Sequence, residues 1–177
     1  MWVSEKAPCV FLANQKTGTR SVVGYLRHHF GCERIGPDHG VSIPPEHQKL
    51  FSFCFVRNPY YRTISLWWTR TRLTGNRVAG MELKKWIKTN HCSQLRFVGV
   101  DRVCKYEDFD MEFSNLPFFV PGSKIPHNNK NRVRRSLRGL GPWTPQRPPY
   151  EDLLSPEIKR LIAKLYEDDF DVLGYDA

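Results

Sequence analysis

Apolar residues along this chain form short continuous runs, and stretches of helically spaced apolar residues follow them. The runs at Val10–Ala13 and Phe51–Val56 are typical of buried strands, and Val100–Tyr106 indicates a third strand. After the first run, apolar residues recur at helical spacing until Gly31, and they do so again over Tyr60–Trp68. This alternation predicts an α/β domain of three layers, in which a mainly parallel central sheet is flanked by helices.

Weaker patterns predict the remaining elements. These are a short strand at Glu33–Ile35, a short helix over Pro44–Leu50, an amphipathic helix over Met81–Asn90, a helix from Glu107 to about Phe119, and a last helix with Ser155 as N-cap and Pro156 as first residue. No internal repeat or clear linker interrupts the 177 residues, which predicts a single domain over 1–177. Residues 121–149 are rich in Pro, Gly, Asn and Arg. They predict an irregular basic loop, either solvated or acting as a lid over an anionic ligand.

The segment after the first predicted strand has the composition of an anion-binding loop. A strand that turns over Gly18 into a helix directs several main-chain N–H groups at one spot, beside the positive end of the helix dipole. Lys16 adds a full positive charge there, so a phosphate-like group is the expected occupant. In a Walker A loop the lysine follows the second glycine, whereas Lys16 precedes Gly18. Ordinary ATP or GTP binding is therefore not indicated.

A second strand–turn–helix unit carries Arg57 at the end of its strand and Ser65 early in its helix. The carboxyl ends of parallel strands share one edge of a sheet, so both residues are expected at the same edge as Lys16. Two such strand–turn–helix units at one edge suit a ligand with two separated phosphate-like groups. Taken singly, Arg57 could equally form a surface ion pair and Ser65 could be a solvated helix residue.

Composition and charge limit the kinds of partner and the cellular compartment that we expect. The formal net charge of +9 indicates anionic partners, which include nucleic acid, an acidic polymer and a polyanionic cofactor. No run is long and apolar enough to span a membrane, and no signal peptide precedes the first strand. We therefore expect a cytoplasmic protein or a chain trimmed from a longer anchored precursor. The five cysteines have no metal-ligand spacing, which favours a reduced compartment and no metal. Cys9, Cys54 and Cys104 fall in predicted strands and are expected in the core.

Two stretches resemble the cofactor motifs of PAPS-dependent sulfotransferases, whose sulfuryl donor is 3′-phosphoadenylyl sulfate (PAPS). They are Gln15–Thr19 (QKTGT) and Phe53–Ser65 (FCFVRNPYYRTIS). The second resembles the FVRNPYxRxxS run of the carbohydrate, Golgi-type branch. Cys104–Phe109 is similar to that family's later KYEDL segment, and Ile125–Asn128 and Leu165–Phe170 also fit. The resemblance therefore covers nearly the whole chain in the family's order.

The resemblance implies a role for each matching residue. The loop would hold the 5′-phosphosulfate, with Lys16 neutralising charge on the bridging oxygen as sulfate leaves. Arg57 and Ser65 would bind the 3′-phosphate, with Lys130 or Arg132 as further clamps. The implied cofactor-binding set is Lys16, Thr17, Gly18, Thr19, Arg20, Ser21, Arg57, Ser65, Lys130 and Arg132. The chain departs from the family at Gln15, where Pro is frequent, and at Arg20, where a small residue is usual. Arg20 would point to solvent or reach the donor or acceptor.

The reaction that the resemblance implies also needs a general base near the acceptor. His39 is the first candidate, because it lies between the two cofactor motifs and the related carbohydrate enzymes use His or Glu at about this place. An unperturbed imidazole titrates near pH 6.5, roughly where proton abstraction at neutral pH requires it. His47, His127 and Glu46 are the alternatives, and His39 could instead be a polar loop residue.

The resemblance thus predicts a sulfotransferase that uses PAPS, without a metal, and releases adenosine 3′,5′-bisphosphate. The acceptor would be a hydroxyl or amine of a glycan, including an anionic glycan, or of a small hydroxylated molecule. Two other functions remain open. The basic charge alone would suit a non-catalytic nucleic-acid-binding module, although no motif for specific nucleic-acid recognition is present. A nucleotide-dependent kinase would need the Walker A lysine and an acidic magnesium site that the sequence does not offer.

Overall fold

The structure is a computed structural model of the chain, and it describes residues 1–71, 81–126 and 148–177. The chain forms two compact units. Unit one comprises Met1–Arg57 and Arg96–Val133, and unit two comprises Asn58–Leu95 and Arg134–Ala177. The single domain over 1–177 stays a prediction, and each unit is described by itself.

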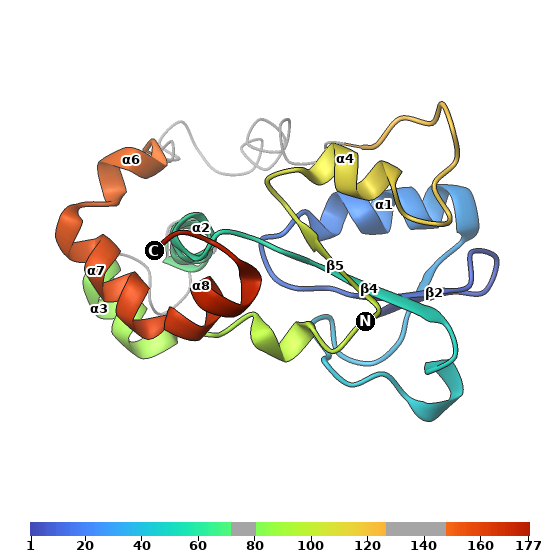
Figure 1. Ribbon diagram of the computed structural model, residues 1–177, viewed down its shortest axis with the longest axis horizontal. Coiled ribbons are helices and arrows are strands. Elements are labelled where there is room, and N and C mark those ends of the chain that lie inside the picture. The colour runs from blue at the N-terminus through green and yellow to red at the C-terminus, as the bar shows by residue number, and fades with distance from the viewer. Residues whose placement is uncertain (72–80, 127–147) are drawn as a thin grey trace. The chain divides into compact units, whose positions relative to one another are not determined.

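Unit one is an α/β structure built on a five-stranded sheet in the order β3-β1-β2-β4-β5 (Figure 1). The strands are β1 (Trp2–Ser4), β2 (Cys9–Leu12), β3 (Glu33–Arg34), β4 (Phe51–Val56) and β5 (Arg102–Lys105). β4 is parallel to both of its neighbours, β2 and β5. β1 is antiparallel to both of its neighbours, β2 and β3.

The prediction of a mainly parallel sheet is therefore wrong, and the sheet is mixed. The sequence analysis missed β1, which has only three residues. Residues 5–8 join it to β2. A connection this short can only reverse the chain, because a crossover between parallel strands needs about a dozen residues or more.

Helices α1 (Thr19–Phe30) and α4 (Phe109–Ser114) cover the same face of the sheet (Figure 1). That face carries Phe11 and Phe53, whose rings stack at 5.0 Å. Tyr25 of α1 meets Phe113 of α4 with ring centroids 4.8 Å apart. Burying this aromatic surface is the main source of stability for the unit. Helices thus flank the sheet as predicted, while the three-layer arrangement stays a prediction.

Predicted helix boundaries differ from those observed at two places in unit one. The helix expected over Pro44–Leu50 is a three-residue 3₁₀ turn, η1 (Pro45–His47), and the one expected to reach Phe119 ends at Ser114 as α4. By contrast, α1 ends as predicted, since Gly31 takes the left-handed conformation with φ 64° that favours glycine at a helix C-terminus. A second 3₁₀ turn, η2 (Leu95–Phe97), contains the position in the sequence where unit two ends, at Leu95, and unit one resumes, at Arg96.

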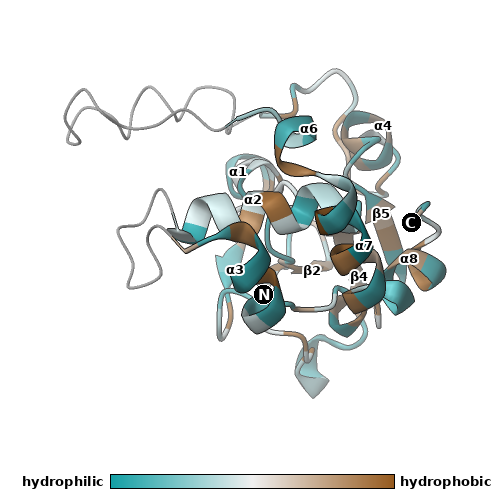
Figure 2. Ribbon diagram, turned by 90° about the vertical axis from the view of Figure 1, so that its left-hand side faces the viewer, coloured by the Kyte–Doolittle hydropathy of each residue, from teal (hydrophilic) through white to brown (hydrophobic). Residues whose placement is uncertain are grey.

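Unit two is helical in its described part. Its helices are α2 (Pro59–Thr71), α3 (Leu83–Asn90), α6 (Tyr150–Leu153), α7 (Pro156–Leu165) and α8 (Glu167–Leu173). They share a core that includes Trp67, Trp86 and Ile162, and α7 alternates between apolar and polar segments in Figure 2. Ser155 caps α7 as predicted, since its hydroxyl accepts a hydrogen bond from the Ile158 N–H. None of the described helices is long and apolar enough to cross a membrane.

Candidate functional site

The candidate site lies in unit one, at the edge of the sheet where three parallel strands end. Leu12 of β2 pairs with Cys54 of β4, and Val56 of β4 pairs with Lys105 of β5. The residues that follow these strands therefore emerge along one edge, which is where ligands bind in open α/β sheets.

Asn14 anchors the loop that leaves β2. Its side chain is fully buried and donates a hydrogen bond of 3.1 Å from Nδ2 to the main-chain oxygen of Phe55 in β4. Its own main-chain oxygen accepts hydrogen bonds from the hydroxyls of Thr17, at 3.0 Å, and Thr19, at 2.7 Å. Both threonines are thus oriented inward to hold the turn.

The loop has two residues with left-handed backbone. Lys16 has φ 66° and Gly18 has φ 83°, and Lys16 is the non-glycine residue with positive φ in the described part of the chain. Such a conformation costs a non-glycine residue about 1 kcal/mol or more. At Gly18 space is also lacking, because a Cβ atom there would lie 2.7 Å from Cε2 of Phe109 and 3.1 Å from Cε2 of Tyr106. The chain therefore requires glycine at this position.

The main-chain N–H groups of the loop suit an anion. Within the described residues, those of Thr17, Gly18 and Thr19 donate no hydrogen bond to the protein. The N–H of Ser21 bonds to the oxygen of Gly18 at 2.8 Å as α1 begins. Helix α1 has no acidic residue in its first turn, so its positive end is not neutralised by a side chain of its own.

The structure brings Arg57 to this loop. Its guanidinium Nη1 donates a hydrogen bond of 3.3 Å to the main-chain oxygen of Lys16, and its Cζ lies 4.7 Å from the ring centroid of Tyr106. Arg57 directly follows β4, and Tyr106 directly follows β5 with its N–H bonded to the oxygen of Val56 at 2.8 Å. Two of the residues predicted to share an edge, Lys16 and Arg57, are therefore in contact.

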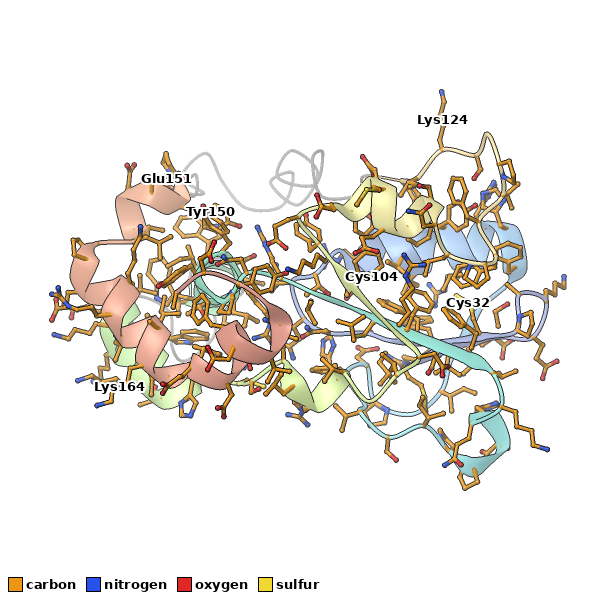
Figure 3. The ribbon with its side chains drawn as sticks, in the orientation of Figure 1. Cys32, Cys104, Lys124, Tyr150, Glu151 and Lys164 are labelled. Atoms are coloured by element: carbon orange, nitrogen blue, oxygen red, sulfur yellow. The ribbon has the colours of Figure 1, made fainter. Side chains whose placement is uncertain are left out.

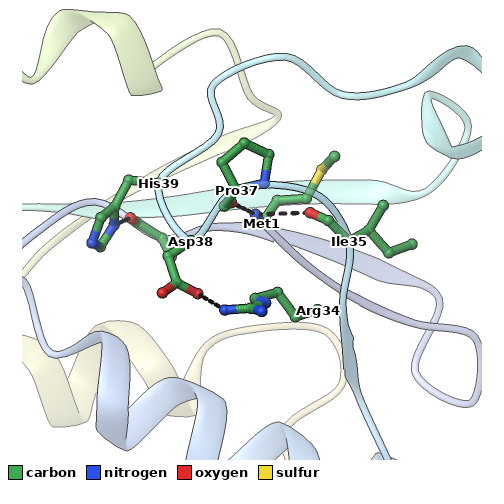
Figure 4. Close-up of polar contacts among 7 residues, drawn as sticks. Met1, Arg34, Ile35, Pro37, Asp38 and His39 are labelled. Carbon is green, nitrogen blue, oxygen red and sulfur yellow. Dashed lines mark hydrogen bonds and ion pairs between the residues drawn. The ribbon is translucent and has the colours of Figure 1, made fainter.

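His39 also reaches the start of this loop (Figure 4). Its ring is half-buried, and Nδ1 lies 2.5 Å from the main-chain oxygen of Ala13, the residue after β2. A carbonyl oxygen can only accept, so Nδ1 carries the hydrogen. In the neutral ring, Nε2 is then the nitrogen with a lone pair that can take up a proton.

The segment before His39 is held by several contacts (Figure 4). The main-chain nitrogen of Met1 donates to the oxygens of Ile35, at 3.2 Å, and Pro37, at 2.8 Å. Asp38 pairs with Arg34 at 2.7 Å, and this hydrogen bond is the main cause that lowers the pKa of the Asp38 carboxyl. These contacts fix the backbone next to the imidazole.

The other predicted site residues lie in varied environments. Arg20 is exposed and Ser21 is buried in α1. Glu46 and His47 lie in η1, and within the described residues neither has a hydrogen bond to the loop. Ser65 is half-buried in α2 and belongs to unit two, whereas the loop belongs to unit one. His127, Lys130 and Arg132 lie outside the described residues.

Three residues that shape the site were not singled out from the sequence: Asn14, Tyr106 and Phe109. A polar residue directly after an apolar strand is the pattern that could have indicated Asn14. Tyr106 and Phe109 lie in the segment that is similar to the family's KYEDL run, yet their contacts with Gly18 and Arg57 depend on β5 lying next to β4. The sequence does not specify that pairing.

The cysteines take no part in this geometry. Within the described part of the chain all five are free thiols (Figure 3 labels Cys32 and Cys104), and Cys9, Cys54 and Cys104 are buried in strands as predicted. Burial raises the pKa of each of these three thiols to about 12 and that of Cys32 to about 11. They are therefore protonated and unreactive at neutral pH. No group of three or more metal-ligating side chains occurs within the described residues.

Comparison of the chain with protein-family models, with curated proteins and with solved structures found no match.

Proposed function

We propose that this protein is a sulfotransferase that moves the sulfuryl group of PAPS to an acceptor hydroxyl or amine. The observation that carries the proposal is the contact between Arg57 and the Lys16 carbonyl. It joins the two cofactor-like motifs at one edge of the sheet, where a nucleotide with phosphate groups at both its 5′ and 3′ positions can meet both. The resemblance of the motifs to those of PAPS-dependent sulfotransferases supplies the identity of the donor.

The loop from Lys16 to Ser21 would take the 5′-phosphosulfate in a P-loop-like manner. Its left-handed turns at Lys16 and Gly18 and the N–H groups of Thr17, Gly18 and Thr19 form a cradle suited to an anion. The Lys16 ammonium would offset the negative charge that grows on the bridging oxygen as the S–O bond breaks.

Arg57 would bind the 3′-phosphate through the planar donor fork of its guanidinium. Its Nη1 is also bonded to the Lys16 carbonyl, which holds the guanidinium beside the loop. Ser65, Lys130 and Arg132 are further ligands by resemblance. Arg20 and Ser21, which lie in the loop, are also cofactor ligands by resemblance.

His39 would act as general base. Its Nδ1–H is held by the Ala13 carbonyl, so Nε2 can accept the proton of the acceptor hydroxyl while the acceptor oxygen bonds to sulfur. The sulfuryl group leaves the bridging oxygen in the same in-line step, and adenosine 3′,5′-bisphosphate departs with the electron pair of the broken bond. The acceptor would be a glycan, including an anionic one, or a small hydroxylated molecule.

Calorimetric titration with adenosine 3′,5′-bisphosphate, adenosine 5′-monophosphate and ATP tests the donor. We expect tight binding of the bisphosphate, at least tenfold weaker binding of the monophosphate, and no need for magnesium. Equal affinity for the bisphosphate and the monophosphate would overturn the two-phosphate assignment. Transfer of label from ³⁵S-PAPS to a panel of glycans and small alcohols, in the presence of EDTA, then identifies the acceptor.

A further inference from the structure

Tyr106 occupies a central place at the edge of the sheet, although no cofactor role follows for it from the motifs. Its ring lies under the Arg57 guanidinium at 4.7 Å and against the backbone of Gly18, where an added Cβ would approach Cε2 to 3.1 Å. Its main chain is fixed by the hydrogen bond to Val56. The half-buried ring is also in contact with Phe109, with centroids 5.7 Å apart. It is therefore held on two sides.

The loop that Tyr106 contacts at Gly18 also contains a residue with a strained backbone. Lys16 has φ 66°, which a non-glycine side chain rarely adopts, and its carbonyl accepts the hydrogen bond from Arg57. A strained backbone persists only when its surroundings hold it. The Arg57 side chain is long and has many rotamers, so its contact with Lys16 depends on what orients the guanidinium. The face of the Tyr106 ring lies against the guanidinium and contributes to that orientation.

We propose that Tyr106 is a positioning residue. Its ring holds the Arg57 guanidinium against the Lys16 carbonyl and so keeps the anion-binding loop in its left-handed form before any ligand arrives. Preorganisation of this kind raises affinity because the ordering is complete before binding. The identity of the ligand rests on the proposed function, whereas the clamp of Tyr106, Arg57 and Lys16 does not.

The test compares Tyr106→Phe, which keeps the ring, with Tyr106→Leu, which removes it, in the full chain. Hydrogen exchange of peptides covering residues 14–21 is measured without ligand, and affinity for adenosine 3′,5′-bisphosphate is measured by calorimetry. We expect Tyr106→Leu to accelerate exchange in the loop and to weaken binding about three- to tenfold. Tyr106→Phe should stay within about twofold of the wild type in both, because the π-face carries the interaction.

Phe118→Leu is the matched control. It removes a half-buried ring from the same core, where Phe118 packs near Phe53 with centroids 5.3 Å apart, and Phe118 is not among the contacts of the loop within the described residues. We expect lower thermal stability with unchanged loop exchange and affinity. Loop exchange accelerated equally by Phe118→Leu would reduce the role of Tyr106 to general stability and overturn the proposal.

The remaining outcomes also decide the proposal. If Tyr106→Leu behaves as the wild type, or Tyr106→Phe is as impaired as Tyr106→Leu, the ring is not the clamp. If Tyr106→Leu does not fold, Arg57→Gln tests the same contacts by removing the guanidinium. It should then accelerate hydrogen exchange in the loop. A wild-type protein that fails to bind the bisphosphate refutes the proposed nucleotide, and the exchange measurements then decide the clamp alone.

Discussion

The imidazole of His39 donates from Nδ1 to the main-chain oxygen of Ala13, the last residue before the anion-binding loop. This bond fixes the tautomer of the ring and ties a residue of the 35–40 segment to the end of β2. A general base must be held in this way if its second nitrogen is to face a substrate.

His39→Asn tests the role of the imidazole as a general base separately from its hydrogen bond to Ala13. An Asn side chain can place its amide N–H near the position of Nδ1 and keep the bond to Ala13, but it has no group that takes up a proton at neutral pH. We expect sulfuryl transfer to fall about 10²- to 10⁴-fold, while the affinity for adenosine 3′,5′-bisphosphate stays within about twofold of the wild type. Steady-state transfer and calorimetry measure the two quantities. Loss of nucleotide affinity equal to that of Arg57→Ala would assign His39 to binding.

Arg57→Lys tests whether the planar guanidinium is required. Lysine keeps the charge but has neither the donor fork nor the flat face that stacks on Tyr106. We expect adenosine 3′,5′-bisphosphate to bind roughly tenfold more weakly to Arg57→Lys and up to about 100-fold more weakly to Arg57→Ala, the range of a charged hydrogen bond. Adenosine 5′-monophosphate should lose less in both variants. A lysine variant with wild-type affinity would show that charge alone suffices.

Gly18→Ala should destabilise unit one, because the residue has φ 83° and its Cβ would enter the Phe109 ring. We expect a loss of about 2–4 kcal/mol in the free energy of unfolding. Gly31→Ala is the matched control, since Gly31 has φ 64° with nothing within 4 Å of an added Cβ, and it should lose only about 1 kcal/mol. Urea unfolding measures both, and equal losses would mean that the Phe109 ring yields without cost.

The strands and helices of greatest apolar content were predictable, and so was the loop between them. Phe51–Val56 forms β4 with the predicted bounds, and Ser155 caps α7. β1 was missed because three residues cannot establish a periodicity, and its antiparallel pairing changes the class of the sheet. The contact of Arg57 with Lys16 follows from the shared edge of parallel strands, which the motifs indicated. The Tyr106 and Phe109 contacts depend on long-range pairing between β4 and β5, for which the local sequence holds no information.

Asp101 should make the stability of unit one depend on pH in the acid range. The carboxylate accepts hydrogen bonds from the N–H of Ser52 at 2.7 Å and from its hydroxyl at 2.8 Å, and these bonds lower the pKa of Asp101. A lowered pKa in the folded state means that the stabilisation is present above the ordinary value near pH 4 and is lost as the pH falls through the folded value. Because Asp101 is exposed, we expect at most about 1 kcal/mol.

Asp101→Asn removes this dependence. The wild type should be the more stable protein at pH 7, and the difference should shrink as the pH is lowered from 5 to 3. Urea midpoints of the two proteins at each pH measure it. A difference that stays constant across this range would assign the stabilisation to the shape of the side chain and not to its charge.

The last prediction concerns the buried carboxylate of Asp169 in unit two. Asp169 is fully buried and accepts hydrogen bonds from the Ser93 hydroxyl and from the Gln94 N–H, the latter at 3.0 Å to Oδ2. In the same unit the buried Arg62, which lies inside the FVRNPYYRTIS run, donates from Nη1 to the oxygen of Cys92 at 2.8 Å. This arginine therefore ties down the 92–94 segment, a structural role that the motif alone does not reveal.

Asp169→Ala would leave the buried N–H of Gln94 and the hydroxyl of the exposed Ser93 without their acceptor. We expect a loss of about 2–4 kcal/mol in the stability of unit two. Asp168→Ala, an exposed neighbour on the same helix, should change stability by no more than about 0.5 kcal/mol. Hydrogen exchange resolved by peptide can assign each loss to its unit. Equal effects of the two substitutions would mean that water reaches the donors of Ser93 and Gln94 once the carboxylate is gone.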